Sequence, residues 1–303
     1  MPILKRFLEG IASRHTRRAY RTDLHNFFGL QDDADLGAAQ IASVSRTDVQ
    51  THARSLQADG KSSSTLRRRL SALRRFFDWA VDEGLSETNP ARAARIHRSD
   101  SSDESRQTDQ ERSVLSKSDV EDLIHAADGA GAAARRNRGL LLTIFYGALR
   151  RSEVAAMDVD DVRPLGRHWV IDVPLGDGLS GGAYVKVPET VVEAIDAVQS
   201  RYGIDEGALW RSLSNRNRGA RMTPDAIYKV MRRTGERAGL STVTVEMLRQ
   251  TGLRLAVEAG ASLQQVQLHG RLKSANSVER LVDTDGQENH LSESAADFLN
   301  LDV

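Results

Sequence analysis

The chain has 303 residues and no cysteine, and its 42 Lys and Arg side chains balance 42 Asp and Glu side chains. This length suits one large domain or two ordinary ones, and the lack of cysteine excludes disulfides, thiolate metal sites and cysteine catalysis. No apolar run reaches the ~18 residues of a membrane span, and residues 1–10 lack the pattern of a secretion signal. We therefore expect a cytoplasmic protein with no membrane partner.

The neutral total hides an uneven distribution of charge. Residues 1–98 carry 17 Lys and Arg against 11 Asp and Glu, a net charge of +6, whereas residues 99–112 carry 2 against 5, a net charge of −3. A basic N-terminal third is a modest indication of a polyanionic partner.

A polar segment divides the sequence. His97–Arg112 contains no aliphatic or aromatic core former beyond its leading histidine, so it buries too little apolar surface to fold and is typical of a linker. We expect a helical domain over residues 1–97, a linker over 98–112, a second domain over 113–290 and a tail over 291–303.

Helical periodicity dominates the first domain. Thr16–Leu30 places apolar and aromatic side chains on one face, and Ser45–Leu56 begins with Ser45 and Asp48 in a capping-box arrangement. A third helix ends before Gly84. Its apolar stripe repeats at helical spacing: Leu66, Leu70, Leu73, Phe77 and Ala80.

Arginines flank the apolar faces of the first and third of these helices. They form either an ordinary solvated face or a face that follows DNA phosphates, because guanidinium keeps its charge and offers a planar fork to phosphate oxygens. The candidate DNA-binding residues of this domain are Arg14, Arg17, Arg18, Arg21, Arg67, Arg68, Arg74 and Arg75.

The second domain reads as mainly α with a small β-sheet. A helix is predicted from Leu115 to Ile124, and the apolar helix Gly139–Leu149 runs into the polar turn Arg150–Glu153. Two strand-like segments flank the glycine-rich turn 176–182 and predict a β-hairpin. The strands are His168–Val173 and Tyr184–Val187, and further helices are predicted over Pro188–Gln199, Thr223–Ala238, Thr244–Glu258 and Ser262–His269.

In this order the segments resemble the tyrosine recombinase/integrase family, of the Xer and phage-integrase type, over nearly the whole chain. RHTRRAYRTDLHNFF and LRRRLSALRRFFDWAVDEGLSETNPA are similar to the helical core-binding (SAM-like) domain of the family. FYGALRRSEVAAMDVDDV and MLRQTGLRLAVEAGASLQQVQ resemble its first-arginine and second-arginine motifs. The resemblance implies a SAM-like domain followed by an α+β catalytic-type domain.

The resemblance also implies a reaction on double-stranded DNA that needs no metal and no cofactor. In the family a tyrosine hydroxyl attacks a DNA phosphate and forms a 3′-phosphotyrosyl link. Two arginines clamp the oxygens of the phosphorane, while a hairpin lysine and histidines move protons. Arg150 and Arg249 match the two arginines, and Glu153 is the family-typical neighbour of the first.

Other positions depart from the family pattern. The nucleophile would fall near Glu279–Leu281, yet no tyrosine of this chain follows Tyr228. The remaining substitutions are Glu246 and Gln250 for two histidines, Asp177 for the hairpin lysine, and Arg271 or Leu272 for a later histidine.

Carboxylates at Asp177 and Glu246 oppose catalysis. At ~4 Å and an effective dielectric of ~20, each adds about 4 kcal/mol of repulsion toward a phosphorane, or roughly 10³-fold in rate. Glu246 has the alternative of pairing with Arg150 or Arg249, which would make the pocket structural. Lys186 is a candidate replacement for the hairpin lysine, and His269 is either a ligand or a helix-end residue.

We therefore predict a recombinase-family protein of site-specific recombination or integration that binds duplex DNA and has lost strand cleavage. It would act beside active recombinase subunits or as a homo-oligomer on DNA. The tail Leu291–Val303 either docks on a neighbouring subunit or packs on its own domain. One alternative is an active recombinase with a displaced nucleophile, for which Tyr228 is the least implausible donor. Another is a scaffold that does not bind DNA.

Overall fold

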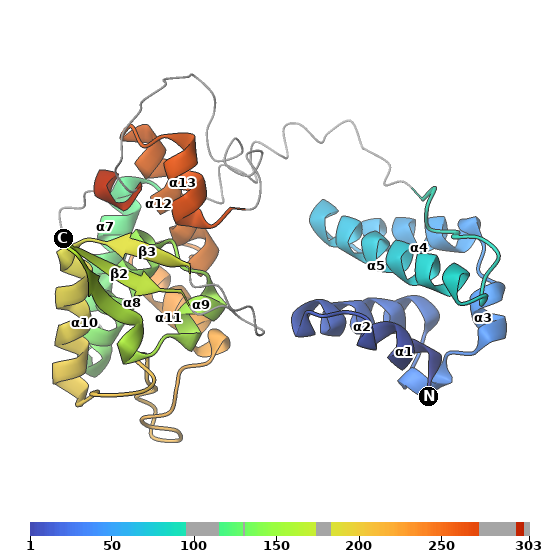
Figure 1. The fold of residues 1–303 in the computed structure, drawn as a ribbon, viewed down its shortest axis with the longest axis horizontal. Helices are drawn as coiled ribbons and strands as arrows, with labels where there is room; N and C mark the ends of the chain where they lie inside the picture. The colour runs from blue at the N-terminus through green and yellow to red at the C-terminus, as the bar shows by residue number, and fades with distance from the viewer. Residues whose placement is uncertain (95–114, 130, 174–182, 273–294, 300–303) are drawn as a thin grey trace. The chain divides into compact units, whose positions relative to one another are not determined.

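The structure is a computed structural model that describes residues 1–94, 115–129, 131–173, 183–272 and 295–299 (Figure 1). The chain forms two compact units, Met1–Glu104 and Ser105–Val303, so the boundary falls inside the segment whose composition indicates a linker. The predicted fold class is confirmed, since helices dominate and the described strands form a three-stranded sheet. Of the helices described, none is long and apolar enough to cross a lipid bilayer.

Serine caps set the ends of the helices in the first unit. The side chains of Ser13, Ser45 and Ser62 each accept a hydrogen bond from the backbone N–H three residues later. The Ser45 N–H donates to the Asp48 carboxylate at 2.8 Å, so the predicted capping box is present. The helices are α1 (Ile3–Glu9), α2 (Arg14–Phe28), α3 (Ala38–Ala42), α4 (Arg46–Ala58) and α5 (Ser63–Asp82).

The predicted apolar stripe of α5 forms the centre of the first core. All five residues of the stripe are buried, because side chains three or four positions apart share one face of a helix. Helix α2 packs against α5. The burial of this stripe leaves Arg67 and Arg75 on an exposed face of the same helix.

A buried helix, α8 (Ala134–Gly147), is the centre of the second unit (Figure 1). It contacts α7, α10, α12 and strand β3, and every residue from Gly139 to Leu149 is buried. The helices around it are α7 (Lys117–Asp128), α9 (Arg151–Ala156), α10 (Glu189–Tyr202), α11 (Pro224–Arg237), α12 (Val245–Glu258) and α13 (Leu263–Gly270).

The sheet is antiparallel, in the order β1-β2-β3. The predicted hairpin strands are β2 (His168–Asp172) and β3 (Tyr184–Val187), which pair with Trp169 opposite Val187. Strand β1 (Val162–Leu165) was not predicted. Its sequence contains Pro164, which a sheet tolerates at an edge, and β1 is an edge strand.

A glycine sets the close approach of α12 to α8. A Cβ atom on Gly252 would lie 2.7 Å from the carbonyl oxygen of Phe145, a separation that any larger residue would have to relieve by movement. Arg249 lies one turn before Gly252 on α12, so this approach carries its side chain to the C-terminal end of α8.

The short 3₁₀ helix η4 (Ala295–Phe298) packs on its own unit, against α12, α13 and β3. Ala295 and Ala296 are buried there. Leu291, the first residue of the predicted tail, lies outside the described residues. Docking of the tail on a neighbouring subunit stays a prediction.

Candidate functional site

The candidate site lies where α8 ends. The backbone of Ala148 enters the left-handed region, with φ +45°, a conformation that costs a non-glycine residue free energy. The turn then leads to Arg150, the N-cap of α9, whose backbone N–H donates to the Glu153 Oε2 atom at 2.7 Å. The last carbonyls of a helix have no partner within the helix, so those of residues 146–148 are open to side chains from elsewhere.

Arg249 binds this helix end from α12. Its Nε donates to the Ala148 carbonyl oxygen at 2.9 Å, its Nη2 to the Gly270 carbonyl oxygen at 2.6 Å, and its Nη1 to Glu246 Oε1 at 2.9 Å. The side chain is 4% exposed. Burial lowers the pKa of the Arg249 guanidinium, and the charge of Glu246 opposes that shift.

Arg271 is bound more completely than Arg249. Its Nη1 donates to the carbonyls of His269 at 2.9 Å and Gly147 at 3.4 Å, and its Nη2 donates to the Ala148 carbonyl at 2.7 Å and Glu153 Oε2 at 2.8 Å. All four Nη hydrogens are therefore used. The Nε is buried and has no hydrogen-bond partner among the described residues.

Glu153 joins two of the arginines. Besides its bond to Arg271, it accepts from Arg150 Nη1 at 2.7 Å, and its side chain is 11% exposed. Burial raises the pKa of Glu153, but Arg271 and the hydrogen bonds from Arg150 outweigh burial, so the net pKa is lowered. Glu153 therefore stays ionised and neutralises part of the local positive charge.

We call Arg150, Arg249, Arg271, Glu153 and Glu246 the arginine site. Its three guanidiniums and two carboxylates leave one net positive charge. Arg150 and Arg249 donate to the carbonyls of two consecutive residues. Arg150 Nη2 donates to the Arg271 carbonyl at 3.1 Å, and Arg249 Nη2 donates to the Gly270 carbonyl. The two family-motif arginines, 99 residues apart in the chain, thus meet at one point.

All three arginines keep an unused N–H group, and that of Arg271 is the buried Nε. A guanidinium carries five N–H groups; those of Arg150 make two of the bonds described and those of Arg249 make three. The Arg150 side chain is also 41% exposed, whereas that of Arg271 is 12% exposed. Because Arg249 is 4% exposed, Arg150 is the most accessible of the three guanidinium groups.

The carboxylate of Glu246 pairs with Arg249 and not with Arg150. Its Oε1 also accepts from the Gln250 side chain at 3.0 Å, and the side chain is 53% exposed. These two residues occupy the positions at which the resemblance implies histidines. Glu246 and Gln250 therefore form a hydrogen-bonded pair beside Arg249.

His269 is buried in the last turn of α13, and its use as a ligand or acid stays a prediction. Its Nε2 lies 2.8 Å from the carbonyl oxygen of Tyr146 at the end of α8. Leu272, the alternative to Arg271 in the histidine position, packs against the apolar core.

The remaining sequence candidates make none of these hydrogen bonds or lie outside the described residues. Tyr228 is 37% exposed on α11, a helix that packs against α7 and α9. Lys186 lies on β3 opposite Val170. Asp177 and Glu279–Leu281, where the family nucleophile would fall, are outside the described residues.

Two family models match the chain. Residues 4–84 match the phage integrase N-terminal SAM-like domain, and residues 113–286, more than half of the chain, match the phage integrase family. The chain belongs to the phage integrase family. The chain is 28% identical to the tyrosine recombinase XerC of Mycobacterium sp. (strain JLS) over 86% of this chain and 85% of the relative. It is 26% identical to the tyrosine recombinase XerD of Oceanobacillus iheyensis over 84% of this chain and 82% of that relative.

Solved structures share the fold. A lambda integrase (75–356) dimer bound to a COC' core site has a TM-score of 0.66 and 18% identity, with 96% of this integrase and 98% of that chain covered. The Tn1549 transposon integrase in complex with transposon right end DNA has a TM-score of 0.68 and 15% identity, with 94% and 96% covered.

Half of the candidate DNA-binding arginines in the first unit of this integrase are tied within that unit. Arg17 and Arg74 donate to backbone carbonyls, those of Ile11 and of Ala91 and Ala94 respectively. Arg21 pairs with Asp33, and Arg68 pairs with Asp23. The others are exposed, and their guanidinium groups make no ion pair or hydrogen bond with a described residue: Arg14, Arg18, Arg67 and Arg75.

Two acidic residues have roles that sequence reasoning did not assign. Asp23 is 2% exposed and binds both Arg68 and Arg69, and a lone aspartate within the apolar periodicity of α2 was a signal for such a pair. Glu153 was identified as a neighbour of the first arginine. Its spacing of three residues from Arg150 indicated the local bond, but its bond to Arg271 crosses 118 residues.

Proposed function

We propose that this integrase binds phosphates of duplex DNA in site-specific recombination complexes and does not itself cleave the strand. The observation that carries the first half is the meeting of Arg150 and Arg249, each with unused N–H groups, at one net-positive site. Arginine forks bind phosphate oxygens through two parallel hydrogen bonds. The bonds to neighbouring backbone carbonyls would hold both forks in place before DNA arrives.

The absence of cleavage rests on the side chains at the positions where the family moves protons and forms the covalent bond. Arg271 cannot act as a general acid near neutral pH, because a guanidinium remains protonated, and its Nη hydrogens are already bonded. Glu246 brings a negative charge to the site where negative charge would develop in a phosphorane. No tyrosine follows Tyr228 in the sequence.

The proposed partners are DNA and other recombinase subunits. Solved relatives include a lambda integrase tetramer bound to a Holliday junction and XerH bound to a difH substrate. We infer that this chain joins such an assembly as a DNA-bound subunit, beside active relatives or as copies of itself, in which strand cleavage is left to another subunit.

The test is a salt-titrated gel shift of the full chain on labelled duplexes tiled across the flanks of its own gene. Wild type is compared with the Arg150→Ala/Arg249→Ala variant, and parallel samples are run on denaturing gels to detect a covalent adduct. The matched control is Arg135→Ala/Arg216→Ala, which removes two exposed arginines outside the arginine site.

We expect affinity to fall steeply between about 50 and 200 mM salt. The site variant should reduce the logarithmic salt slope by about one, since the two arginines share one phosphate and each phosphate contact contributes ~0.9. The control should keep the wild-type slope, and no adduct should form. Absence of binding at low salt would contradict the DNA half and leave a scaffold. An adduct that disappears in Tyr228→Phe would contradict the second half and identify a displaced nucleophile.

A further inference from the structure

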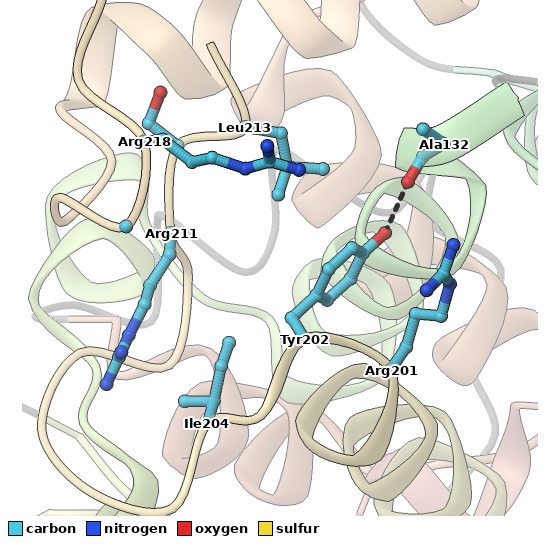
Figure 2. A pocket seen from close by; sticks show the side chains of 9 residues that line it. Ala132, Arg201, Tyr202, Ile204, Arg211, Leu213 and Arg218 are labelled. Atoms are coloured by element: carbon cyan, nitrogen blue, oxygen red, sulfur yellow. Dashed lines mark hydrogen bonds between the residues drawn. The ribbon is translucent and has the colours of Figure 1, made fainter. Parts of the chain in front are cut away.

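A pocket of about 320 Å³ lies at the other end of α8 (Figure 2). Its walls come from the turn before α8, the C-terminal end of α10 and the loop between α10 and α11. The lining residues are Ala132, Arg201, Tyr202, Ile204, Arg211, Ser212, Leu213, Arg218 and Gly219.

The charge of this pocket is unbalanced. Three of its lining residues are arginines and none is acidic. Arg201 and Arg218 are exposed, and no described carboxylate forms an ion pair with either of them or with Arg211. Pockets that collect uncompensated guanidinium groups attract multiply charged oxyanions.

The backbone holds one of these arginines in position. Arg211 Nε donates to the Ala208 carbonyl oxygen at 2.8 Å, and its Nη2 donates to the Glu206 carbonyl oxygen. These bonds leave three of its five N–H groups for a ligand. The Arg211 guanidinium is therefore bonded to the loop backbone and extends away from Tyr202 (Figure 2), whereas Arg201 and Arg218 are exposed and can adjust to what enters.

The pocket also offers apolar and aromatic surface. Tyr202 donates its hydroxyl hydrogen to the Ala132 carbonyl oxygen at 2.7 Å, which fixes the ring, and Arg201 lies 5.9 Å from the ring centroid. Figure 2 shows Arg218 extending beside Leu213, with Tyr202 and Arg201 on the other side. A ligand here would meet guanidinium groups and a fixed aromatic ring together.

The pocket is separate from the arginine site. Ala132 precedes α8 and Ala148 follows it, and the 14 residues of this helix span about 21 Å at ~1.5 Å per residue. A phosphate group bound between Arg150 and Arg249 therefore cannot also reach the pocket.

We propose that this pocket binds a small molecule that carries a phosphate monoester or diphosphate group. The three positive charges match the charge of about −2 of a phosphate monoester at neutral pH and the larger charge of a diphosphate. The volume falls at the lower end of the ~300–1,000 Å³ of small-ligand sites, which suits a group no larger than a nucleotide.

The test is calorimetric titration of the full chain with pyrophosphate, ADP and, as a general anion, sulfate. Arg218→Ala removes an exposed lining arginine, and Arg216→Ala removes an exposed arginine of the same loop that does not line the pocket. Thermal midpoints of both variants, and their affinity for duplex DNA, are measured alongside. These two measurements separate a failure of this proposal from a failure of the proposed DNA binding.

We expect one equivalent of pyrophosphate or ADP to bind, Arg218→Ala to weaken that binding about tenfold or more, and Arg216→Ala to leave it within about twofold. Tighter binding of ADP than of pyrophosphate would assign a nucleotide, and equal binding a free phosphate group. The proposal is overturned if neither ligand binds at millimolar concentration, if sulfate binds equally well, if Arg216→Ala weakens binding as much as Arg218→Ala, or if duplex DNA displaces the ligand.

Discussion

Glu153 binds two arginines of the arginine site at once. We therefore expect its replacement to lower the free energy of unfolding. Its carboxylate binds Arg150, the N-cap of its own helix, and Arg271, which lies 118 residues later in the chain. Removing one member of a buried ion pair leaves the other charge uncompensated, and this costs more than the pair itself contributes.

We predict that Glu153→Gln lowers the free energy of unfolding by about 3 kcal/mol at neutral pH, because Arg271 loses its buried counter-charge. Urea unfolding of the full chain measures the effect. The matched control is Glu258→Gln, whose partner Arg254 and carboxylate are both solvent-accessible and which should cost less than about 1 kcal/mol. Equal losses in both variants would contradict the role assigned to Glu153.

The same variant has a defined pH dependence. The pKa of Glu153 lies below its ordinary value of 4.5 in the folded chain. A carboxylate with a lowered folded pKa stabilises the fold above its unfolded pKa, and this stabilisation is lost as the pH falls through the folded pKa. The difference between wild type and Glu153→Gln should therefore be full above about pH 5.5 and shrink below about pH 4.5.

Glu246 limits the affinity of the arginine site for phosphate. We predict that Glu246→Gln tightens binding to duplex DNA about fivefold, which corresponds to the ~1 kcal/mol of a unit charge at ~4 Å in water. Glu258→Gln removes the same charge from the same helix, but about 18 Å farther along it and beyond the ~8–10 Å screening length. Gel shifts that show equal gains for both variants would contradict a local effect of Glu246.

At the scale of one element, α5 separates two uses of arginine. Arg67 and Arg75 are both exposed, and they lie eight residues or about 12 Å apart along the helix. Arg74, beside Arg75 in the sequence, instead ties the chain that follows the helix by donating to the carbonyls of Ala91 and Ala94 at 3.2 and 2.7 Å. Adjacent arginines of one helix therefore serve solvent-facing and structural purposes.

We predict that Arg67→Ala/Arg75→Ala reduces the logarithmic salt slope of DNA binding by about two and leaves the thermal midpoint unchanged. Arg74→Ala should show the reverse, with a loss of about 1–2 kcal/mol of stability from its hydrogen bonds and an unchanged slope. Salt-titrated gel shifts and thermal unfolding of both variants check this. A slope that falls equally in Arg74→Ala would place Arg74 on the DNA face.

At the scale of the whole molecule, the net positive charge is concentrated in the first unit, whereas the arginine site belongs to the second unit. Residues 1–98 carry a net charge of +6, whereas the arginine site in the second unit contributes a net charge of one. DNA affinity should therefore come largely from the first unit, as counterion release, while the arginine site positions one phosphate.

The contributions of the two groups of arginines to the free energy of DNA binding should add. We predict that combining Arg67→Ala/Arg75→Ala with Arg150→Ala/Arg249→Ala changes the free energy of DNA binding by the sum of the two effects, within about 0.5 kcal/mol, because the altered residues share no partners. Gel shifts of the two double variants and the quadruple variant measure this. A larger coupling would indicate that the two units bind DNA as one cooperative surface.

Local features of this integrase followed from its sequence, because their causes lie within a few residues. The Ser45–Asp48 capping box and the apolar stripe of α5 need a spacing of three or four positions, and both are present. Strand β1 was missed because Pro164 and the lack of alternation hide a short edge strand. The family arginines were identified from motifs, each of which is contiguous in the chain.

The partners of those arginines were decided by tertiary structure. Glu246 was open to pairing with Arg150 or Arg249, and it forms the local pair with Arg249, three residues along α12. The bond of Arg249 to the Ala148 carbonyl, in contrast, crosses 101 residues and depends on the approach of α12 to α8. No partner for Arg271 was evident from the sequence, and its Nη2 donates to the carbonyl of Ala148, 123 residues away in the chain. Sequence alone determined which residues carry charge and which helices bury their faces, since these depend on local spacing. Which N–H groups remain free for an oxyanion depends on contacts between residues far apart in the chain, and therefore only the folded chain decided it.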